Sequence, residues 1–543
     1  MTIDQAFAAA LKLQQAGRPA EAESAYREIL TEHSERPEVH YNLGVVLRAQ
    51  GRLRDAANAY ERAIELRSHF PEAINNLAET FESMGELDNA EDWFRHGLLL
   101  NPQSASGWSN LGGVLKDLGR LDESIECLDR ALTLEPNNAR IRNNRIFTLH
   151  YSAKFDAAAL GEAAGEWGRR HAAPTPALNS SPPRPPLLNR RLRVGYVSSY
   201  FREHCQAFFL VPLFRHHDPR AVEIVVYHDS SIDDAVTKEL KSFATVWHSV
   251  AGMNDQAVAD LVQQDRIDVL VDLTLHMAEN RLGVFAKKPA PVQITWLGYP
   301  GTTGVRAIDF RISDPYLDPV GTKMYYTEKT LRLPDSFWCY DPLTIEAAVS
   351  PPPSSASGKI TFGCLNNFCK VTDQTLDLWS QVLRQLPDSR LLLLAPSGAT
   401  RVRVKTKLGL TSDRIEFVAY QPRTDYLKLY QRIDVCLDTF PYNGHTTSLD
   451  TLWSGVPVVS LCGSTAVSRA GLSLMSNLGL DELVATTPAD FVRIATELAQ
   501  DKTRVAELRA MLHERMRRSP LMDAPRFARS LENAYRKAWQ SME

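Results

Sequence analysis

The sequence predicts a solenoid of paired α-helices, followed by an α/β region that contains two doubly wound parallel sheets. Three observations lead to this fold class. Glycines recur every 34 residues near the N-terminus, short apolar segments alternate with helical ones from residue 192 onward, and two Pro/Ser-rich segments interrupt the chain. Strand–helix alternation of this kind is typical of parallel sheets that are covered by helices.

The N-terminal period of 34 residues is visible at three positions of each unit. The repeating residues are Gly17, Gly51, Gly85 and Gly119, then Ala22, Ala56, Ala90 and Ser124, and then Tyr26, Tyr60, Phe94 and Leu128. Glycine permits a tight turn, and alanine lets paired helices approach closely. The pattern resembles the tetratricopeptide repeat, and four units fill residues 3–138. The concave face of such an array usually binds a peptide or protein, and a structural oligomerisation or capping element is the alternative.

The rest of the chain divides at changes in composition. We expect capping helices at 139–172, a Pro-rich linker at 173–191, and strands in two series that are separated by the segment SPPPSSASG at 350–358. The expected strands are residues 192–199, 223–228, 268–274 and 292–299, then 359–365, 389–396, 414–420, 434–440 and 456–461. They predict Rossmann-like domains at 192–349 and 359–520 with a cleft between them, and a C-terminal helix at 521–543 that packs back.

Composition excludes several classes of function. The net charge is −4 over 543 residues, which gives no basic surface for nucleic acid. We find no apolar run long enough to span a bilayer, so no membrane partner is expected. Seven cysteines without a C-x-x-C spacing favour reduced thiols in the cytoplasm over a disulfide or zinc framework.

The segment DTFPYNGHTTSLDTLW (438–453) places many small polar residues after a predicted core strand. We expect a helix to start near Thr446, with Thr447-x-x-Asp450 as a capping box. The free N–H groups at a helix N-terminus bind phosphate oxygens, and Asp450 is placed to accept hydrogen bonds from a ribose. The alternative is a capped helix in an ordinary loop.

Two other strand ends carry residues suited to the same ligand. His204 follows the first strand of the first series, and Lys370 follows the first strand of the second series. A lysine that faces a diphosphate neutralises the charge that develops on a leaving group. The sequence contains no Asp-x-Asp, no His/Cys cluster with metal spacing and no P-loop. We therefore expect no metal or other cofactor, and a diphosphate held by a helix N-terminus and cations.

From residue 192 to about 540 the chain resembles the O-GlcNAc transferase family, which joins tetratricopeptide repeats to a two-domain glycosyltransferase of the GT-B type. The residues that carry the resemblance are VGYVSSYFREH (194–204), KKPAPVQITWLGYPGTTG (287–304), FGCLNNFCKVTDQTL (362–376), DVCLDTFPYNGHTTSLDTLWSGVPVV (434–459) and RFARSLENAYRKAW (526–539). With the repeats, the resemblance covers nearly the whole chain.

The resemblance implies a role for each matching residue. It implies that His204 lies on the acceptor side as a candidate base, and that Lys370 stabilises the UDP leaving group. The residues implied for the donor are His445, Thr446 and Thr447 at the diphosphate, Asp450 at the ribose, Arg423 and Tyr426 near the uridine, and Asn367. The implied reaction is an inverting, metal-independent transfer of GlcNAc from UDP-GlcNAc to Ser or Thr hydroxyls of a protein acceptor that the repeats guide.

Two alternatives stay open. A SPINDLY-like protein O-fucosyltransferase that uses GDP-fucose shares DTFPY and GYPGTTG features, although the NGHTT-x-x-D segment favours a UDP-sugar. A repeat scaffold with weak or no transferase activity is the other, and intact diphosphate residues argue against it. The acceptor protein and the oligomeric state are not determined by the sequence.

Overall fold

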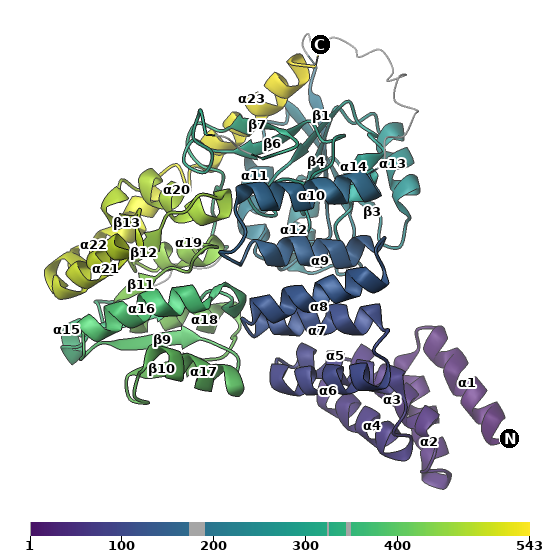
Figure 1. The fold of residues 1–543 in the computed structure, drawn as a ribbon. Coiled ribbons are helices and arrows are strands. Elements are labelled where there is room, and N and C mark those ends of the chain that lie inside the picture. Colours follow the sequence, from purple (N-terminus) through teal and green to yellow (C-terminus); the bar gives the residue numbers. More distant parts are fainter. Residues whose placement is uncertain (1, 173–189, 323–324, 344–348, 543) are drawn as a thin grey trace. The chain divides into compact units, whose positions relative to one another are not determined.

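The computed structural model describes residues 2–172, 190–322, 325–343 and 349–542. These residues form two compact units, which are residues 1–141 with 395–403, and residues 142–394 with 404–543 (Figure 1). The predicted linker at 173–191 lies outside the described residues except for its last two positions. Across the described ranges, no helix has the length and apolar character needed to cross a bilayer.

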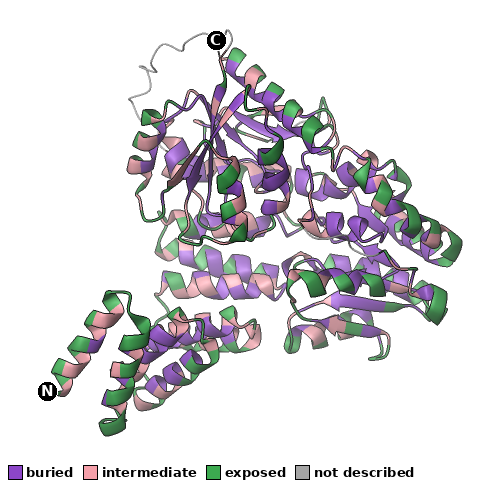
Figure 2. Cartoon of the chain, turned by 180° about the vertical axis from the view of Figure 1, so that it is seen from behind, coloured by how far each residue is buried: buried purple, intermediate pink, exposed green. Residues whose placement is uncertain are grey.

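The first unit is a stack of antiparallel helix pairs. Its helices are α1 (Ile3–Gln15), α2 (Pro19–Glu32), α3 (Pro37–Ala49), α4 (Leu53–Leu66), α5 (Pro71–Ser83), α6 (Leu87–Leu100), α7 (Ala105–Asp117) and α8 (Leu121–Leu134). The four predicted turn glycines have φ angles of 69 to 75°, a left-handed conformation that glycine adopts without a steric cost. The repeated alanines are fully buried, and most helices are buried on one side and exposed on the other (Figure 2). The predicted solenoid is confirmed.

The second unit contains two parallel sheets, which confirms the predicted α/β class. The first sheet has the order β3-β2-β1-β4-β5-β6-β7. Its strands are β1 (Leu192–Ser198), β2 (Val222–His228), β3 (Val246–Ser249), β4 (Val269–Asp272), β5 (Val292–Thr295), β6 (Phe310–Ser313) and β7 (Lys329–Arg332). Its helices are α11 (Ala207–His216), α12 (Ala235–Phe243), α13 (Asp255–Gln264) and α14 (Leu282–Ala286), and α23 (Ala524–Gln540) packs back onto α11.

The second sheet has the order β10-β9-β8-β11-β12-β13. Its strands are β8 (Thr361–Cys364), β9 (Arg390–Leu394), β10 (Ile415–Val418), β11 (Val435–Leu437), β12 (Val458–Leu461) and β13 (Val484–Ala485). The helices around it are α15 (Ser354–Ser357), α16 (Asp373–Gln385), α17 (Ala399–Leu408), α18 (Arg423–Leu429), α19 (Thr446–Trp453), α20 (Ala470–Asn477), α21 (Pro488–Gln500) and α22 (Lys502–Arg517), with short 3-10 turns η2 (Phe368–Lys370), η3 (Tyr430–Arg432), η4 (Ala466–Arg469) and η5 (Asp481–Leu483).

All nine expected strands are present, and β3, β6, β7 and β13 are additional. The partly exposed strands β3 and β7 lie at the two edges of the first sheet, and β13 has only two residues, so none of these three gives a continuous apolar run. In both sheets the strand order reverses beside the first strand, between β1 and β4 and between β8 and β11. Ligands of doubly wound sheets bind beyond the carboxyl ends of the strands at such a reversal.

Two helices precede the first sheet and pack on it. Helix α9 (Ala139–Leu149) begins at the end of the first unit, and α10 (Ala157–His171) lies entirely within the second. His276, which follows β4, donates from Nε2 to the carbonyl of Thr303 (2.9 Å) and meets the amide of Asn143 at Nδ1 (2.8 Å). The residues expected to cap the repeats therefore include part of the second unit's own core.

The packing of α10 leaves no room for a side chain at Gly168. A Cβ at Gly168 would lie 1.9 Å from the carbonyl oxygen of Gly304, whereas a Cβ at Gly165 on the same helix would approach only the flexible end of Arg169, at 3.3 Å. We expect Gly168→Ala to lower stability by about 1–3 kcal/mol because the backbones must separate. Gly165→Ala is the matched control and should leave stability equal or raised by up to about 1 kcal/mol. Thermal unfolding of both variants tests this, and equal unfolding midpoints would contradict the packing.

Candidate functional site

Loops at the strand-order reversals of both sheets come together in the second unit. The loop after β1 carries His204, the 3-10 turn after β8 carries Lys370, and the loop after β11 runs into the N-terminus of α19. The sequence analysis singled out all three segments as strand ends. Their convergence places loops from both sheets at one site.

The loop after β11 is organised around the buried carboxylate of Asp438. Its Oδ1 accepts hydrogen bonds from the backbone N–H groups of Thr439 (2.8 Å) and Gly444 (2.7 Å). Its Oδ2 accepts from the hydroxyl of Ser460 on β12 at 2.7 Å. Asn366, which follows β8, donates to Thr439 Oγ1 at 3.1 Å. These bonds fix the path of the loop from the strand to the start of α19.

Helix α19 starts at Thr446 as expected, but the predicted capping box is wrong. None of the described side chains caps this N-terminus, and His445 occupies the N-cap position. The Asp450 carboxylate is turned away to Arg423 and Tyr340. A helix leaves its first N–H groups without intrahelical partners, so the start of α19 presents donors that an anion can bind.

The ammonium group of Lys370 lies beside this helix start. Its Nζ donates to the carbonyl of Asn443 at 3.0 Å and lies 4.2 Å from the centre of the Tyr442 ring. Burial lowers the pKa of Lys370, and nearby groups that include Asp438 oppose that effect. No carboxylate among the described residues forms an ion pair with Lys370. Its charge is therefore available to an anionic ligand.

His445 lies between the two halves of the site. Its ring contacts the Trp338 ring at 5.0 Å and the Tyr442 ring at 4.8 Å. Burial and the charge of Lys370 hold the pKa of His445 well below its usual range, so the imidazole is neutral. Its buried Nε2 has no hydrogen-bond partner among the described residues. A buried polar nitrogen of this kind points to a ligand atom as its partner.

The carboxylate of Asp450 is occupied by a buried ion pair. Arg423, at the start of α18, donates from Nη1 and Nη2 to the two Asp450 oxygens, each at 2.7 Å. Tyr340 from the first domain donates to Asp450 Oδ1 at 2.5 Å. The Arg423 guanidinium lies 4.1 Å above the Phe208 ring. Burial lowers the pKa of Arg423, but bonding to Asp450 outweighs it and raises the pKa overall.

Two further predicted residues, Tyr426 and Asn367, differ in how they connect to the start of α19. Tyr426 hydrogen bonds through its hydroxyl to the Tyr430 hydroxyl at 2.6 Å, and Tyr430 reaches the carbonyl of Thr447 at 3.3 Å. Tyr426 is thereby linked to the first turn of α19. Asn367 is exposed, and its carbonyl accepts the Lys370 backbone N–H at 3.0 Å. The buried asparagine of this pair is Asn366, which the sequence analysis did not select.

His204, in the loop after β1, is held against an aromatic ring. Its imidazole stacks on the Tyr200 ring, with centroids 4.2 Å apart and planes at 19°. Its Nδ1 accepts the backbone N–H of Gln206 at 3.3 Å. Burial, together with the nearby charge of Arg202, lowers the pKa of His204 to about 4. The imidazole is neutral at neutral pH and accepts protons weakly.

The interactions of Cys205 show that the loop after β1 lies close to the N-terminus of α19. Burial raises the pKa of its thiol, while the charge of Lys370 and a hydrogen bond with the Thr446 side chain oppose that effect. These interactions bring the residue after His204 to the start of α19. The loop that carries His204 therefore lies close to Lys370 and Thr446.

The sequence analysis did not select five residues whose hydrogen bonds or ring contacts hold the site together. These are Tyr340, Asn366, Asp438, Tyr442 and Asn443. Asp438 and Tyr442 lie inside the segment that was selected, so their position next to the helix start was the available signal. Tyr340 follows no predicted strand, and only its buried hydroxyl identifies it.

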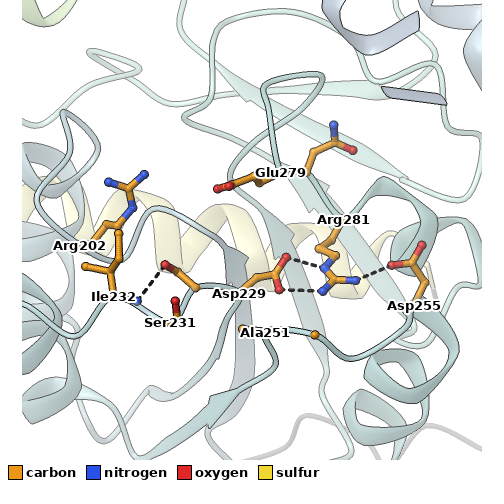
Figure 3. A pocket seen from close by; sticks show the side chains of 11 residues that line it. Arg202, Asp229, Ser231, Ile232, Ala251, Asp255, Glu279 and Arg281 are labelled. Atoms are coloured by element: carbon orange, nitrogen blue, oxygen red, sulfur yellow. Dashed lines mark hydrogen bonds and ion pairs between the residues drawn. The ribbon is translucent and has the colours of Figure 1, made fainter. Parts of the chain in front are cut away.

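A further hollow of about 530 Å³ lies beyond the carboxyl ends of β2, β3 and β4 (Figure 3). Its floor is an ion-pair network in which Arg281 donates to both oxygens of Asp229 (2.5 and 2.7 Å) and to Asp255 (3.0 Å). Arg202 also lines the hollow and belongs to the same loop as His204. The hollow is therefore a fixed feature of the domain that carries His204.

The site contains no assembled metal ligands. Across the described ranges, no group of three or more His, Cys, Asp or Glu side chains is arranged to hold a metal ion. The groups available to an anion are the N-terminus of α19, Lys370 and the His445 ring.

Known proteins resemble this chain over most of its length. It is 38% identical over 407 residues to the probable UDP-N-acetylglucosamine–peptide N-acetylglucosaminyltransferase SPINDLY of Hordeum vulgare, covering 73% of this chain and 43% of that protein. It is 30% identical to the similarly named SEC protein of Arabidopsis thaliana, over 64% of this chain and 37% of that protein. The chain thus spans less than half the length of these curated relatives.

A solved structure extends the likeness to the whole fold. A lysine-to-methionine mutant of Thermobaculum terrenum O-GlcNAc transferase superposes with a TM-score of 0.86 at 35% identity, covering 93% of this chain and 98% of that chain. Tetratricopeptide repeat profiles match residues 7–53, 37–70, 71–104 and 105–138. The profile of glycosyl transferase family 41 matches residues 180–347 and 353–531. The chain belongs to glycosyl transferase family 41, with tetratricopeptide repeats ahead of the family's domain.

Proposed function

We propose that this protein is an inverting, metal-independent glycosyltransferase that moves GlcNAc from UDP-GlcNAc to Ser or Thr hydroxyls of protein acceptors. The observation that carries the proposal is the uncapped N-terminus of α19 with the Lys370 ammonium beside it. Backbone donors and a cation at one place bind a diphosphate and stabilise it as it leaves. The names of the relatives, which refer to UDP-N-acetylglucosamine and a peptide, support the donor and the acceptor class.

The diphosphate has three kinds of partner in this proposal. The first-turn N–H groups and the hydroxyls of Thr446 and Thr447 bind its oxygens, and the neutral His445 ring lies beside them at the N-cap position. Lys370 supplies the positive charge. Since charge on the leaving group grows as the sugar bond breaks, Lys370 acts most strongly in the transition state.

The nucleoside requires the Arg423–Asp450 pair to rearrange. Both Asp450 oxygens are already bonded to Arg423, and one also accepts from Tyr340. For Asp450 to accept the ribose hydroxyls, at least one of these donors must turn away. Arg423 then lies beside the nucleoside together with Tyr426, in agreement with the roles that the family resemblance implies.

The reaction is a single in-line displacement. The acceptor oxygen forms a bond to the anomeric carbon as the bond from that carbon to the phosphate oxygen breaks, and UDP leaves with the bonding electrons. One displacement inverts the anomeric configuration. The hydroxyl proton passes to His204 or through a chain of water molecules. Because the pKa of His204 is about 4, it is a weak base, and its main contribution is to orient the acceptor.

The second candidate donor is GDP-fucose, as in a SPINDLY-like protein O-fucosyltransferase. The higher identity to SPINDLY proteins than to SEC, 38% against 30%, favours it. The histidine of NGHTT-x-x-D favours the UDP-sugar, because His445 contributes its ring to the diphosphate region. A scaffold without activity is the third candidate. Lys370 argues against it, because this lysine is desolvated and forms no ion pair among the described residues. A lysine with a purely structural role has no need of such surroundings.

The repeats supply the partner surface. An array of paired helices presents a groove for an extended peptide, and we propose that it delivers acceptor proteins to the catalytic unit. We expect no nucleic acid or membrane partner and a cytoplasmic location, as the sequence analysis predicts.

Lys370 should be needed for turnover and not for folding. We expect Lys370→Ala to lower transfer by a factor of about 100 or more, the usual cost of removing one group that stabilises developing charge. Release of UDP from UDP-GlcNAc in the presence of a peptide library measures it. Lys359→Ala, an exposed lysine of the same domain, is the control and should keep full activity. Turnover by the Lys370 variant at the parent rate would remove this residue from the mechanism.

Nucleotide binding separates the two candidate donors. A ligand that binds only the folded state raises its stability by about 2.7 kcal/mol at 100 times its Kd. We expect UDP to raise the Tm well above the shift that GDP gives at the same concentration. Asp450→Asn should reduce the UDP shift, because the ribose loses an ionised acceptor. A larger shift with GDP would favour the O-fucosyltransferase.

The low pKa of His204 is directly measurable. A histidine whose folded pKa is depressed stays neutral down to that value and gains its proton only below it, so His204 should not titrate between pH 8 and about 5. Carbon-13-labelled histidine followed by NMR across this range tests it, with His204→Gln to assign the resonance. A midpoint near 6.5 would mean that His204 is solvated and a stronger base than proposed.

A further inference from the structure

Tyr442 lies at the centre of the donor-side loop, and neither the sequence nor the reaction chemistry assigns it a role. Its side chain is buried. The Lys370 ammonium is 4.2 Å from the centre of its ring, and the His445 ring is 4.8 Å away. The Tyr151 ring stacks on it at 4.9 Å with 23° between planes. The Tyr442 ring therefore contacts two groups that we assign to the diphosphate.

Lys370 has an unusual set of partners for a desolvated lysine. Its Nζ donates to the carbonyl of Asn443 and lies over the face of the adjacent Tyr442 ring. Within the described ranges, it has no ion-pair partner. An aromatic face attracts an ammonium group without neutralising it. The ring thus orients the ammonium group of Lys370. It does not neutralise the positive charge, which stays available to the ligand.

Tyr151 comes from outside both sheets. It follows α9, the helix that continues from the repeats, and its ring packs edge-on against Phe147 of that helix at 5.3 Å. Phe147 and His150 in turn contact the ring of Tyr299, which follows β5, at 5.4 and 4.8 Å. This aromatic cluster ties the end of α9 to the first domain and holds Tyr151 where it meets the donor-side loop.

We propose that Tyr442 is a positioning residue for Lys370, and that Tyr151 holds the Tyr442 ring in place. The residues that follow the repeats then help to set the geometry of the donor site, in addition to connecting the repeats to the first sheet. The inference rests on the proposed role of Lys370. If Lys370→Ala keeps full activity, the proposed function fails. If Lys370→Ala loses activity but Tyr442→Leu and Tyr151→Leu do not, only the inference is rejected.

The ring, and not the hydroxyl, carries the predicted effect. The hydrogen bond that fixes residue 442 runs from Thr439 Oγ1 to its backbone carbonyl at 2.8 Å. Tyr442→Phe keeps the ring and should bind UDP and turn over the donor within about twofold of the parent. Tyr442→Leu keeps apolar bulk but loses the aromatic face. We expect it to weaken UDP binding by about three- to tenfold, within the range of cation–π contacts, and to lower kcat more than it raises KM.

A double-mutant cycle distinguishes positioning from general damage. UDP affinity is measured by calorimetry for the parent chain, Lys370→Ala, Tyr442→Leu and the double variant, so that the readout does not depend on residual activity. If the ring acts through Lys370, Tyr442→Leu weakens binding in the parent and has no further effect on Lys370→Ala. An equal loss in both backgrounds, or parent-like binding by Tyr442→Leu, would overturn the proposal.

Tyr151 provides a second, independent test if Tyr442→Leu does not fold. Tyr151→Leu should lower UDP affinity and kcat in the same direction as Tyr442→Leu, about two- to fivefold, because a stacked ring contributes less than a direct contact. Tyr151→Phe should restore both values. The same cycle with Lys370→Ala applies. Parent-like kinetics for a folded Tyr151→Leu would show that the residues after α9 do not influence the donor site.

Discussion

The loop that runs from β11 into α19 depends on one buried carboxylate. Asp438 directly follows β11 and accepts hydrogen bonds from the N–H of Gly444 and the hydroxyl of Ser460, both at 2.7 Å. A buried carboxylate is stable only when its lone pairs are used, so these donors are held firmly. The loop can then follow one path, and that path delivers an uncapped helix N-terminus to the ends of the sheet. Lys370 is held at the same place because its Nζ donates a hydrogen bond to the loop's own carbonyl at Asn443.

Some charged groups in and near the site form ion pairs within the protein, whereas Lys370 forms none with the described residues. Arg423 is paired with Asp450 through two bonds of 2.7 Å, and Arg281 is paired with Asp229 at the floor of the neighbouring hollow. Lys370, by contrast, faces an aromatic ring. An aromatic face holds a cation without cancelling its charge, which suits a residue that must meet a diphosphate. Tyr151 stacks on the same ring, so the residues after α9 are in contact with the surroundings of Lys370.

Much of the fold could be predicted because it follows from local periodicity. The glycines at Gly17, Gly51, Gly85 and Gly119 identify the helix pairs, and the apolar runs identify nine strands. The edge strands β3 and β7 gave no such run, because none of their residues is buried. Of the candidate site, the segments selected at strand ends lie close together in the structure. The capping box was wrong because Arg423, 27 residues away in sequence, offers Asp450 a stronger partner than the helix does.

The sequence by itself determined the class of the protein: the repeats, the two sheets, the polar strand ends and the family they resemble. These features depend on neighbours within a few residues, or on periods of 2, 3.6 and 34 residues, which can be read along a chain. Tertiary structure alone decided which polar groups are free. Whether a lysine faces a carboxylate or a ring, and whether an aspartate caps a helix or pairs with an arginine, depends on contacts between distant segments. Those contacts are set by burial, because each buried polar group takes the strongest partner within reach.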